Sequence, residues 1–167
     1  MTEAIALFRI VLAAILGGAI GFERAGLHKE AGVRTHILVA IGATLFTMIS
    51  IHGFAEAEYP TRIDYSRIMS EIVSGIGFLG AGMIVFWDKK VHGLTTAAGL
   101  WVCAAIGMAV GIGWYIIATT TTLVALFILH VVMKWIPLST AQEEYPPLEK
   151  KSSRRVTPSS KRGAKKE

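Results

Sequence analysis

The residues that could do chemistry gather in two short polar segments of an otherwise strongly apolar chain. They are Glu23, Arg24, Arg34, Thr35 and His36 in the first segment and Thr95 and Thr96 in the second. Each segment leads into an apolar run of helical length, so each lies at the start of a predicted helix. Free N–H groups and a partial positive charge meet at such a start, and with Arg24 and Arg34 nearby it could bind a phosphate or a lipid head group. Alternatively, the arginines neutralise the acids of the same loops, Glu23, Glu30 and Asp88.

A second chemical candidate is Glu71, a carboxylate inside the apolar run 68–87. Ionised residues inside a membrane are costly and usually face a pathway or a partner, so Glu71 is a possible metal ligand. Mg²⁺ prefers oxygen ligands and is the cation that such a site would suit. The simpler alternative is an ion pair with Arg67, four residues earlier on the same helix face. No other cofactor is indicated.

The composition places the chain in a membrane. Hydrophobic residues make up 53% of the 167 residues, and the mean hydropathy is +0.53, which is too apolar for a soluble domain of this size. No nucleophile with a matching base is apparent, so we expect no enzymatic activity. The one cysteine, Cys103, excludes a disulfide within the chain.

The hydrophobic runs predict an all-α, polytopic protein with about five transmembrane helices. A single helix from Thr95 to Ile136 would be about 60 Å long, about twice the bilayer core, so the chain must fold back once. Gly111 and Gly113 mark that break. The expected helices cover residues 4–22, 36–54, 68–87, 95–111 and 113–136. Residues 137–167 form a basic tail that we expect to be disordered and cytoplasmic.

The distribution of basic residues predicts the orientation, because cytoplasmic loops collect Lys and Arg. With five helices and the N-terminus outside, most of the 17 Lys and Arg residues lie inside, including those of the tail. A four-helix arrangement with the tail inside moves more of them outside and is the weaker alternative. The tail is then a topology signal that contacts anionic lipid, and we expect no binding to nucleic acid.

Glycines and other small residues recur at helical spacing in the predicted spans. Thr95, Gly99, Cys103, Gly107 and Gly111 follow one another at intervals of four and form one stripe on a helix face. Other glycines of this kind are Gly17, Gly21, Gly75, Gly77, Gly80 and Gly82. Such residues let membrane helices approach closely, so we expect close packing and a homodimer formed along the 95–111 helix. A bent backbone that lines a pathway is the alternative.

The motifs G-x-E-R, A-G-x-R-T-H-x-L-V, R-I-x-x-x-I-V-S-G-I-G-F-L-G-A-G and G-L-T-T-A-A-x-L-W resemble those of the MgtC/SapB family of bacterial membrane proteins. The resemblance covers roughly residues 12 to 112. It implies a multi-pass inner-membrane protein associated with magnesium homeostasis. It also implies signature roles for the polar residues and most of the glycines named above. At Thr95 the sequence departs from the branch named for MgtC, which typically has Asn there.

Two functional hypotheses remain open at this point. One is a non-enzymatic accessory or regulatory protein that binds itself or another membrane protein. The other is a magnesium transporter or channel that uses Glu71. The predicted distance between Glu23 and Glu71, at opposite membrane faces, leaves no carboxylate pair at one depth and favours the accessory hypothesis.

Overall fold

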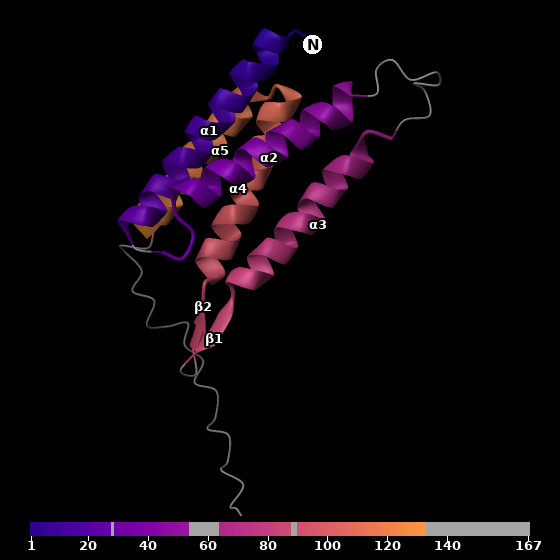
Figure 1. Ribbon diagram of the computed structural model, residues 1–167. Coiled ribbons are helices and arrows are strands. Elements are labelled where there is room, and N and C mark those ends of the chain that lie inside the picture. Colours follow the sequence, from indigo (N-terminus) through magenta and orange to yellow (C-terminus); the bar gives the residue numbers. More distant parts are fainter. Residues whose placement is uncertain (28, 54–63, 88–89, 133–167) are drawn as a thin grey trace, which may run out of the picture.

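The structure is a computed structural model that describes residues 1–27, 29–53, 64–87 and 90–132 (Figure 1). Its described part contains α-helices and one antiparallel pair of short strands. The elements are α1 (Glu3–Gly26), α2 (Val33–His52), α3 (Ser66–Met83), β1 (Val85–Trp87), β2 (Lys90–His92), α4 (Leu94–Ile112) and α5 (Tyr115–Phe127), which a π-helical turn (Ile128–Val132) extends. The predicted tail, 137–167, lies outside the described residues.

Three of the described helices, α1, α2 and α4, are long and apolar enough to cross a membrane. The apolar helix that begins with α5, Tyr115–His130, is shorter. Helix α3 lies where the third span was expected but does not meet the same criterion of length and hydropathy. The chain therefore has the helices of a membrane protein, at the positions that the hydrophobic runs indicate.

The predicted third helix is wrong at its C-terminal end. The helix stops at Met83, and β1 and β2 form an antiparallel pair in which Val85 pairs with His92 and Trp87 with Lys90. The β-branched and aromatic side chains of Val85, Phe86 and Trp87 favour a strand as readily as the end of an apolar helix. Gly93 then begins α4 with a φ of 85°, and a Cβ there would lie 1.9 Å from the carbonyl oxygen of Met83. Only glycine fits this junction.

The turn between α4 and α5 falls at the predicted glycines. Gly113 has a φ of 102°, and the N–H groups of Gly113 and Trp114 both bond to the carbonyl of Ala109. This closure ends α4 at Ile112 and starts α5 at Tyr115, two residues later than expected.

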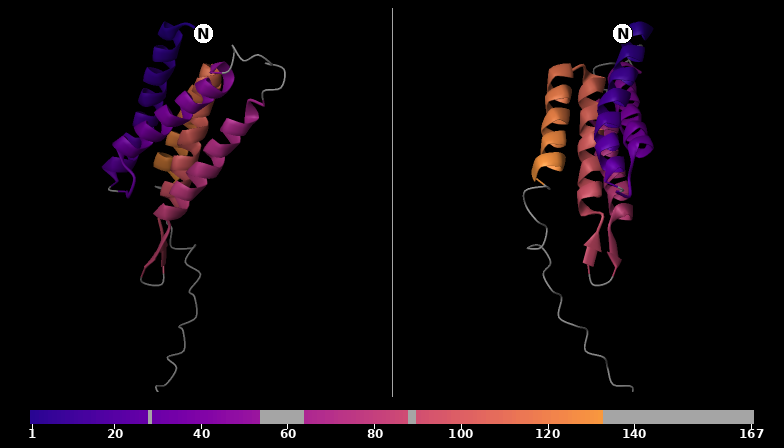
Figure 2. Two further views of the ribbon diagram at one scale, coloured as in Figure 1. Left: turned by 45° about the vertical axis from the view of Figure 1, so that its right-hand side comes forward. Right: turned by 90° about the vertical axis from the view of Figure 1, so that its left-hand side faces the viewer.

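Helix α4 is the centre of the bundle, with α1 and α2 on one side and α5 on the other (Figure 2). The main core cluster joins α1, α2, α4 and α5 around Ala13, Ile20, Ala40, Cys103 and Val110. A second cluster, which includes Ala43, Ile76 and Ala104, joins α3 to α2 and α4.

The small-residue stripe of α4 packs inside the protomer, against α2. A Cβ on Gly107 would lie 2.4 Å from the carbonyl oxygen of Ala40, and one on Gly111 would lie 2.7 Å from Cβ of Thr47. The Thr44 hydroxyl donates a buried hydrogen bond to the Gly107 carbonyl at 2.8 Å. The prediction that this stripe forms the interface of a homodimer is therefore wrong about its location, since α2 already covers it.

The remaining predicted packing glycines behave in two ways. Gly17 and Gly21 of α1 admit the first turns of α2 at distances that a side chain would not allow, and Gly80 of α3 lies against Ala97. Gly75, Gly77 and Gly82 of α3 face open space, with no atom within 4 Å of an added Cβ. Glycines thus allow close packing among α1, α2 and α4, whereas most glycines of α3 have no neighbouring helix among the described residues.

Candidate functional site

The last turn of α1 carries a buried ion pair between neighbouring residues. Nε of Arg24 lies 3.1 Å from Oε2 of Glu23, and the Arg24 side chain is completely buried while that of Glu23 is 12% exposed. Gly21, one turn earlier, allows this end of α1 to touch the backbone of Val33 at the start of α2. Removing a guanidinium from water is costly without a compensating anion, so Glu23 stabilises the buried position of Arg24.

His36 belongs to the same buried cluster. It lies in the first turn of α2, is fully buried, and its Nδ1 is 2.9 Å from the carbonyl oxygen of Gly32. Its Nε2 is buried without a hydrogen-bond partner among the described residues. A Cβ on Gly99 of α4 would lie 3.7 Å from this nitrogen, an ordinary van der Waals distance, so α4 lies directly beside the ring. Glu23 and Arg24 are the charged groups that act on His36.

We define the Glu23–Arg24–His36 cluster by these three side chains, which come from α1 and α2 and lie close to α4. Both carboxylate oxygens of Glu23 are buried, with no hydrogen bond among the described residues. Buried polar atoms in this state usually bind water or an ion, or change protonation. The cluster therefore presents buried polar atoms of Glu23 and His36 that an ordered water or an ion could satisfy at one end of the bundle.

A second contact joins the loop after α1 to the start of α4. The Thr96 hydroxyl donates a hydrogen bond to Oε2 of Glu30 at 2.7 Å, across 66 positions of sequence. Thr96 is buried, and its hydrogen bond is the main reason that the pKa of Glu30 lies below its ordinary value of 4.5. The first polar segment and the second are thus physically linked. The partner of Glu30 is therefore Thr96 and not an arginine, as the sequence had suggested.

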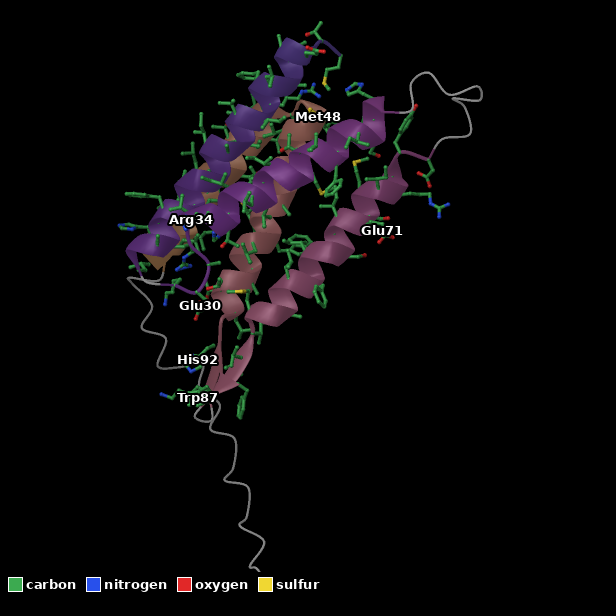
Figure 3. All side chains as sticks on the ribbon, in the orientation of Figure 1. Glu30, Arg34, Met48, Glu71, Trp87 and His92 are labelled. Carbon is green, nitrogen blue, oxygen red and sulfur yellow. The ribbon has the colours of Figure 1, made fainter. Side chains whose placement is uncertain are left out.

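The other predicted site residues lie on the surface of the described structure. Arg34, Thr35 and Thr95 are exposed. Figure 3 shows Arg34 and Glu30 at the same end of the bundle. The predicted polar constellation therefore divides into a buried cluster, the Glu30–Thr96 contact and an exposed set that is free to meet an anion.

Glu71 lies far from these residues. It is exposed on α3 and points away from α2 and α4 (Figure 3). The described residues contain no group of three or more His, Cys, Asp and Glu side chains that could hold a metal ion. The structure accordingly brings Glu71 into contact with neither Glu23 nor His36.

Arg9 is a residue whose role the sequence analysis missed. Its guanidinium donates to the Gly111 carbonyl at 2.7 Å and to the Tyr115 hydroxyl at 3.0 Å, and it lies over the Tyr115 ring. It therefore joins α1 to the turn between α4 and α5, where the last carbonyls of α4 need partners. The signal for it was a lone arginine near one end of an apolar helix, opposite a glycine turn.

Comparisons with known proteins agree with the motifs. The model of the MgtC family matches residues 10–136. A protein of Escherichia coli strain K12 named "Putative magnesium transporter YhiD" is 44% identical over 127 residues, which cover 75% of this chain and 59% of that protein. "Protein MgtC" of Brucella abortus strain 2308 is 48% identical over 99 residues, covering 59% of this chain and 39% of that protein.

"Protein SrpB" of Synechococcus elongatus is 38% identical over 130 residues, covering 71% of each chain. No solved structure matches the chain. The chain spans little more than half of the E. coli relative and less of the Brucella relative. With apolar helices in the expected places and a family match over most of its length, this chain is a membrane protein that belongs to the MgtC family.

Proposed function

We propose that the chain is a non-enzymatic accessory or regulatory protein of magnesium homeostasis in the bacterial inner membrane. The observation that carries the proposal is the Glu23–Arg24–His36 cluster, buried where α1, α2 and α4 meet. Because these side chains lie where three helices meet, a change in their hydrogen bonding acts on all three. The MgtC family and the magnesium in the printed name of one relative give the physiological context.

The packing next to the cluster supports a regulatory role over a conducting one. Beyond His36, α2 and α4 meet through Gly107 and Gly111 at backbone distance and through the Thr44 hydrogen bond. Helices in such contact move as a unit, and a shift at one end is transmitted to the other. A water-filled path needs the opposite, a separated helix pair lined by polar groups.

The membrane arrangement that we propose has five spans, with the N-terminus outside and the C-terminus in the cytoplasm. It rests on the excess of Lys and Arg in the loops that this arrangement places inside. Cys103 is buried, so in a Cys103→Ser chain a cysteine placed at Thr2 or Lys29 reports its side of the membrane. An impermeant thiol reagent applied to intact spheroplasts should label Thr2→Cys and not Lys29→Cys. The reverse pattern would contradict the orientation.

The second candidate function is magnesium transport, which the printed name of the E. coli relative favours. In this chain Glu71 would have to act from the uncovered side of α3, because it faces away from the other helices. The two functions differ in one measurable property, which is whether the purified chain carries Mg²⁺ across a vesicle membrane.

The proposed role of the cluster is tested by growth in low magnesium. A strain that depends on this protein should be rescued by the wild type but poorly by Glu23→Gln or Arg24→Gln, each of which breaks the ion pair. Glu3→Gln makes the same chemical change at an exposed position of α1 and serves as the control. Rescue is compared at equal membrane abundance. Full rescue by both cluster variants would overturn the assignment of function to this cluster.

A further inference from the structure

Helix α3 has a face that no other described element covers. It packs on α2 and α4 through one narrow row of residues in which Ile76 and Gly80 are buried. The rest of the helix surface is exposed, including Arg67, Glu71 and Ser74, and Phe78 is 81% exposed. Figure 3 shows Glu71 on the outer side of the bundle. We call this surface the outer α3 face, defined by Arg67, Ser70, Glu71, Ser74, Gly77 and Phe78.

The outer α3 face is poorly suited to lipid. Helices α1, α2 and α4 are apolar enough to cross a membrane, whereas α3 is not among the described helices that meet this criterion. Its serine hydroxyls are satisfied by its own backbone, from Ser70 to the Arg67 carbonyl at 2.7 Å and from Ser74 to the Ser70 carbonyl at 3.2 Å, so the charged side chains are the groups that lipid disfavours. Arg67 interacts electrostatically with the neighbouring Asp64, and neither Arg67 nor Glu71 forms a salt bridge among the described residues. Charged groups on a membrane helix are stabilised by pairing with another helix.

We infer that the outer α3 face packs against the same face of a second copy of this chain. Two copies in one membrane share one orientation, so a two-fold axis along the membrane normal places the two α3 helices side by side in parallel. Arg67 and Glu71 are one helical turn apart on this face, so in a parallel pair each charge lies diagonally across from the opposite charge of the other copy. Arg67 of each copy reaches Glu71 of the other, and the symmetry forms the ion pair twice.

The glycine on this face permits the approach. A Cβ at Gly77 would have no neighbouring atom within 4 Å in the described part of the chain, so a second helix can lie directly on the backbone there. The α4 stripe, in contrast, is already filled by α2. This interface is independent of whether the chain regulates or transports magnesium.

Disulfide formation between introduced cysteines tests the interface in native membranes. In a Cys103→Ser chain, Ser74→Cys is a nearly isosteric change at the centre of the face. Ile15→Cys, at a position of α1 that is 62% exposed, is the matched control. Mild oxidation should convert Ser74→Cys to a species of twice the chain mass several-fold more than Ile15→Cys. Equal yields would overturn the inference, as would a Ser74→Cys product whose mass shows a different protein.

Two further changes separate an interface from chance collision. Gly77→Leu fits within the protomer but fills the approach, so it should reduce the Ser74→Cys product to the level of the Ile15→Cys control. The charge reversal Glu71→Arg should also reduce the product, and the double change Arg67→Glu with Glu71→Arg should restore it. A product that is unaffected by Gly77→Leu, or a double change that fails to restore it, would contradict the arrangement proposed here.

Discussion

The hydrogen bond between Thr96 and Glu30 joins the polar segment after α1 to the polar segment at the start of α4. It is made by a buried hydroxyl and a largely exposed carboxylate. Because the hydroxyl stabilises the ionised carboxylate, the pKa of Glu30 is lower in the folded chain than in the unfolded chain. The stabilisation is therefore present above the ordinary pKa of 4.5 and is lost as the pH falls through the folded value.

The first prediction concerns Thr96→Val, which keeps the shape and removes the donor. We expect it to lower the free energy of unfolding by about 0.5 kcal/mol at pH 7, since the exposed carboxylate is screened by water. The deficit should shrink as the pH falls through the lowered pKa of Glu30, because the hydroxyl then faces a neutral carboxyl group in the wild type. Thermal unfolding of the two proteins in the same detergent at several pH values measures this. A deficit that stays constant down to pH 3 would mean that packing, and not the hydrogen bond, is responsible.

The second prediction concerns Arg9, which bonds to the last turn of α4 and to Tyr115. Arg9→Gln should lower the free energy of unfolding by about 1–2 kcal/mol, because the Gly111 carbonyl loses a charged donor. Arg9→Lys should recover only part of this loss, because an ammonium group lacks the planar fork of guanidinium. Arg34→Gln is the control, as Arg34 is exposed at the other end of the bundle. Equal melting temperatures for Arg9→Gln and Arg34→Gln would refute a structural role for Arg9.

Among the helices, two glycines have opposite surroundings. Gly107 of α4 leaves no room for a side chain against Ala40 of α2. Gly42 lies on the α2 side of an apolar groove of about 390 Å³ between α2 and α3, and an added Cβ there would have no atom of the described residues within 4 Å. The same chemical change at these two positions should therefore have opposite consequences.

The third prediction follows from this contrast. Gly107→Ala should destabilise the chain by about 1–3 kcal/mol, as overpacking does, because its Cβ would meet the backbone of α2. Gly42→Ala should stabilise it by about 0.5–1 kcal/mol through helix propensity alone. Melting temperatures in detergent decide the matter. If Gly107→Ala were as stable as the wild type, the close contact of α2 and α4 would be wrong.

The element boundaries show how far hydrophobic patterning reaches. The apolar runs and the Gly111–Gly113 break predicted the starts of α1, α2, α4 and α5 to within about three residues. The first helix runs on to Gly26 instead of ending at residue 22, and the predicted end of the last helix, 136, lies outside the described residues. The pair of strands could not be predicted from the apolar run 68–87. Val85, Phe86 and Trp87 are as apolar as the end of a membrane helix, and three residues are too few to tell the period of a strand from that of a helix. The φ of Gly93 and its contact with Met83 are tertiary facts that no local pattern contains.

Across the whole molecule, the sequence indicated most residues of the candidate site. It did not indicate that they divide into a buried cluster, the Glu30–Thr96 contact and an exposed set. Glu23 and Arg24 are adjacent, so their pairing could be expected from sequence alone. The burial of His36 beside Gly99 and the Glu30–Thr96 contact both depend on how α4 packs against the first two helices. Both join residues more than 60 positions apart. The α4 stripe was likewise visible as a packing surface, but its spacing cannot distinguish α2 from a second copy as the neighbour.

We proposed that the chain regulates magnesium homeostasis through the buried Glu23–Arg24–His36 cluster and does not itself carry Mg²⁺. Magnesium flux into proteoliposomes tests this most directly. Vesicles with the wild-type chain, with Glu71→Gln and without protein are compared, and the thermal transition of the reconstituted protein shows that it is folded. If the chain is a regulator, vesicles that contain folded wild-type protein should take up Mg²⁺ no faster than empty vesicles under any imposed gradient. Uptake well above empty vesicles that falls with Glu71→Gln would contradict it and make the chain a transporter.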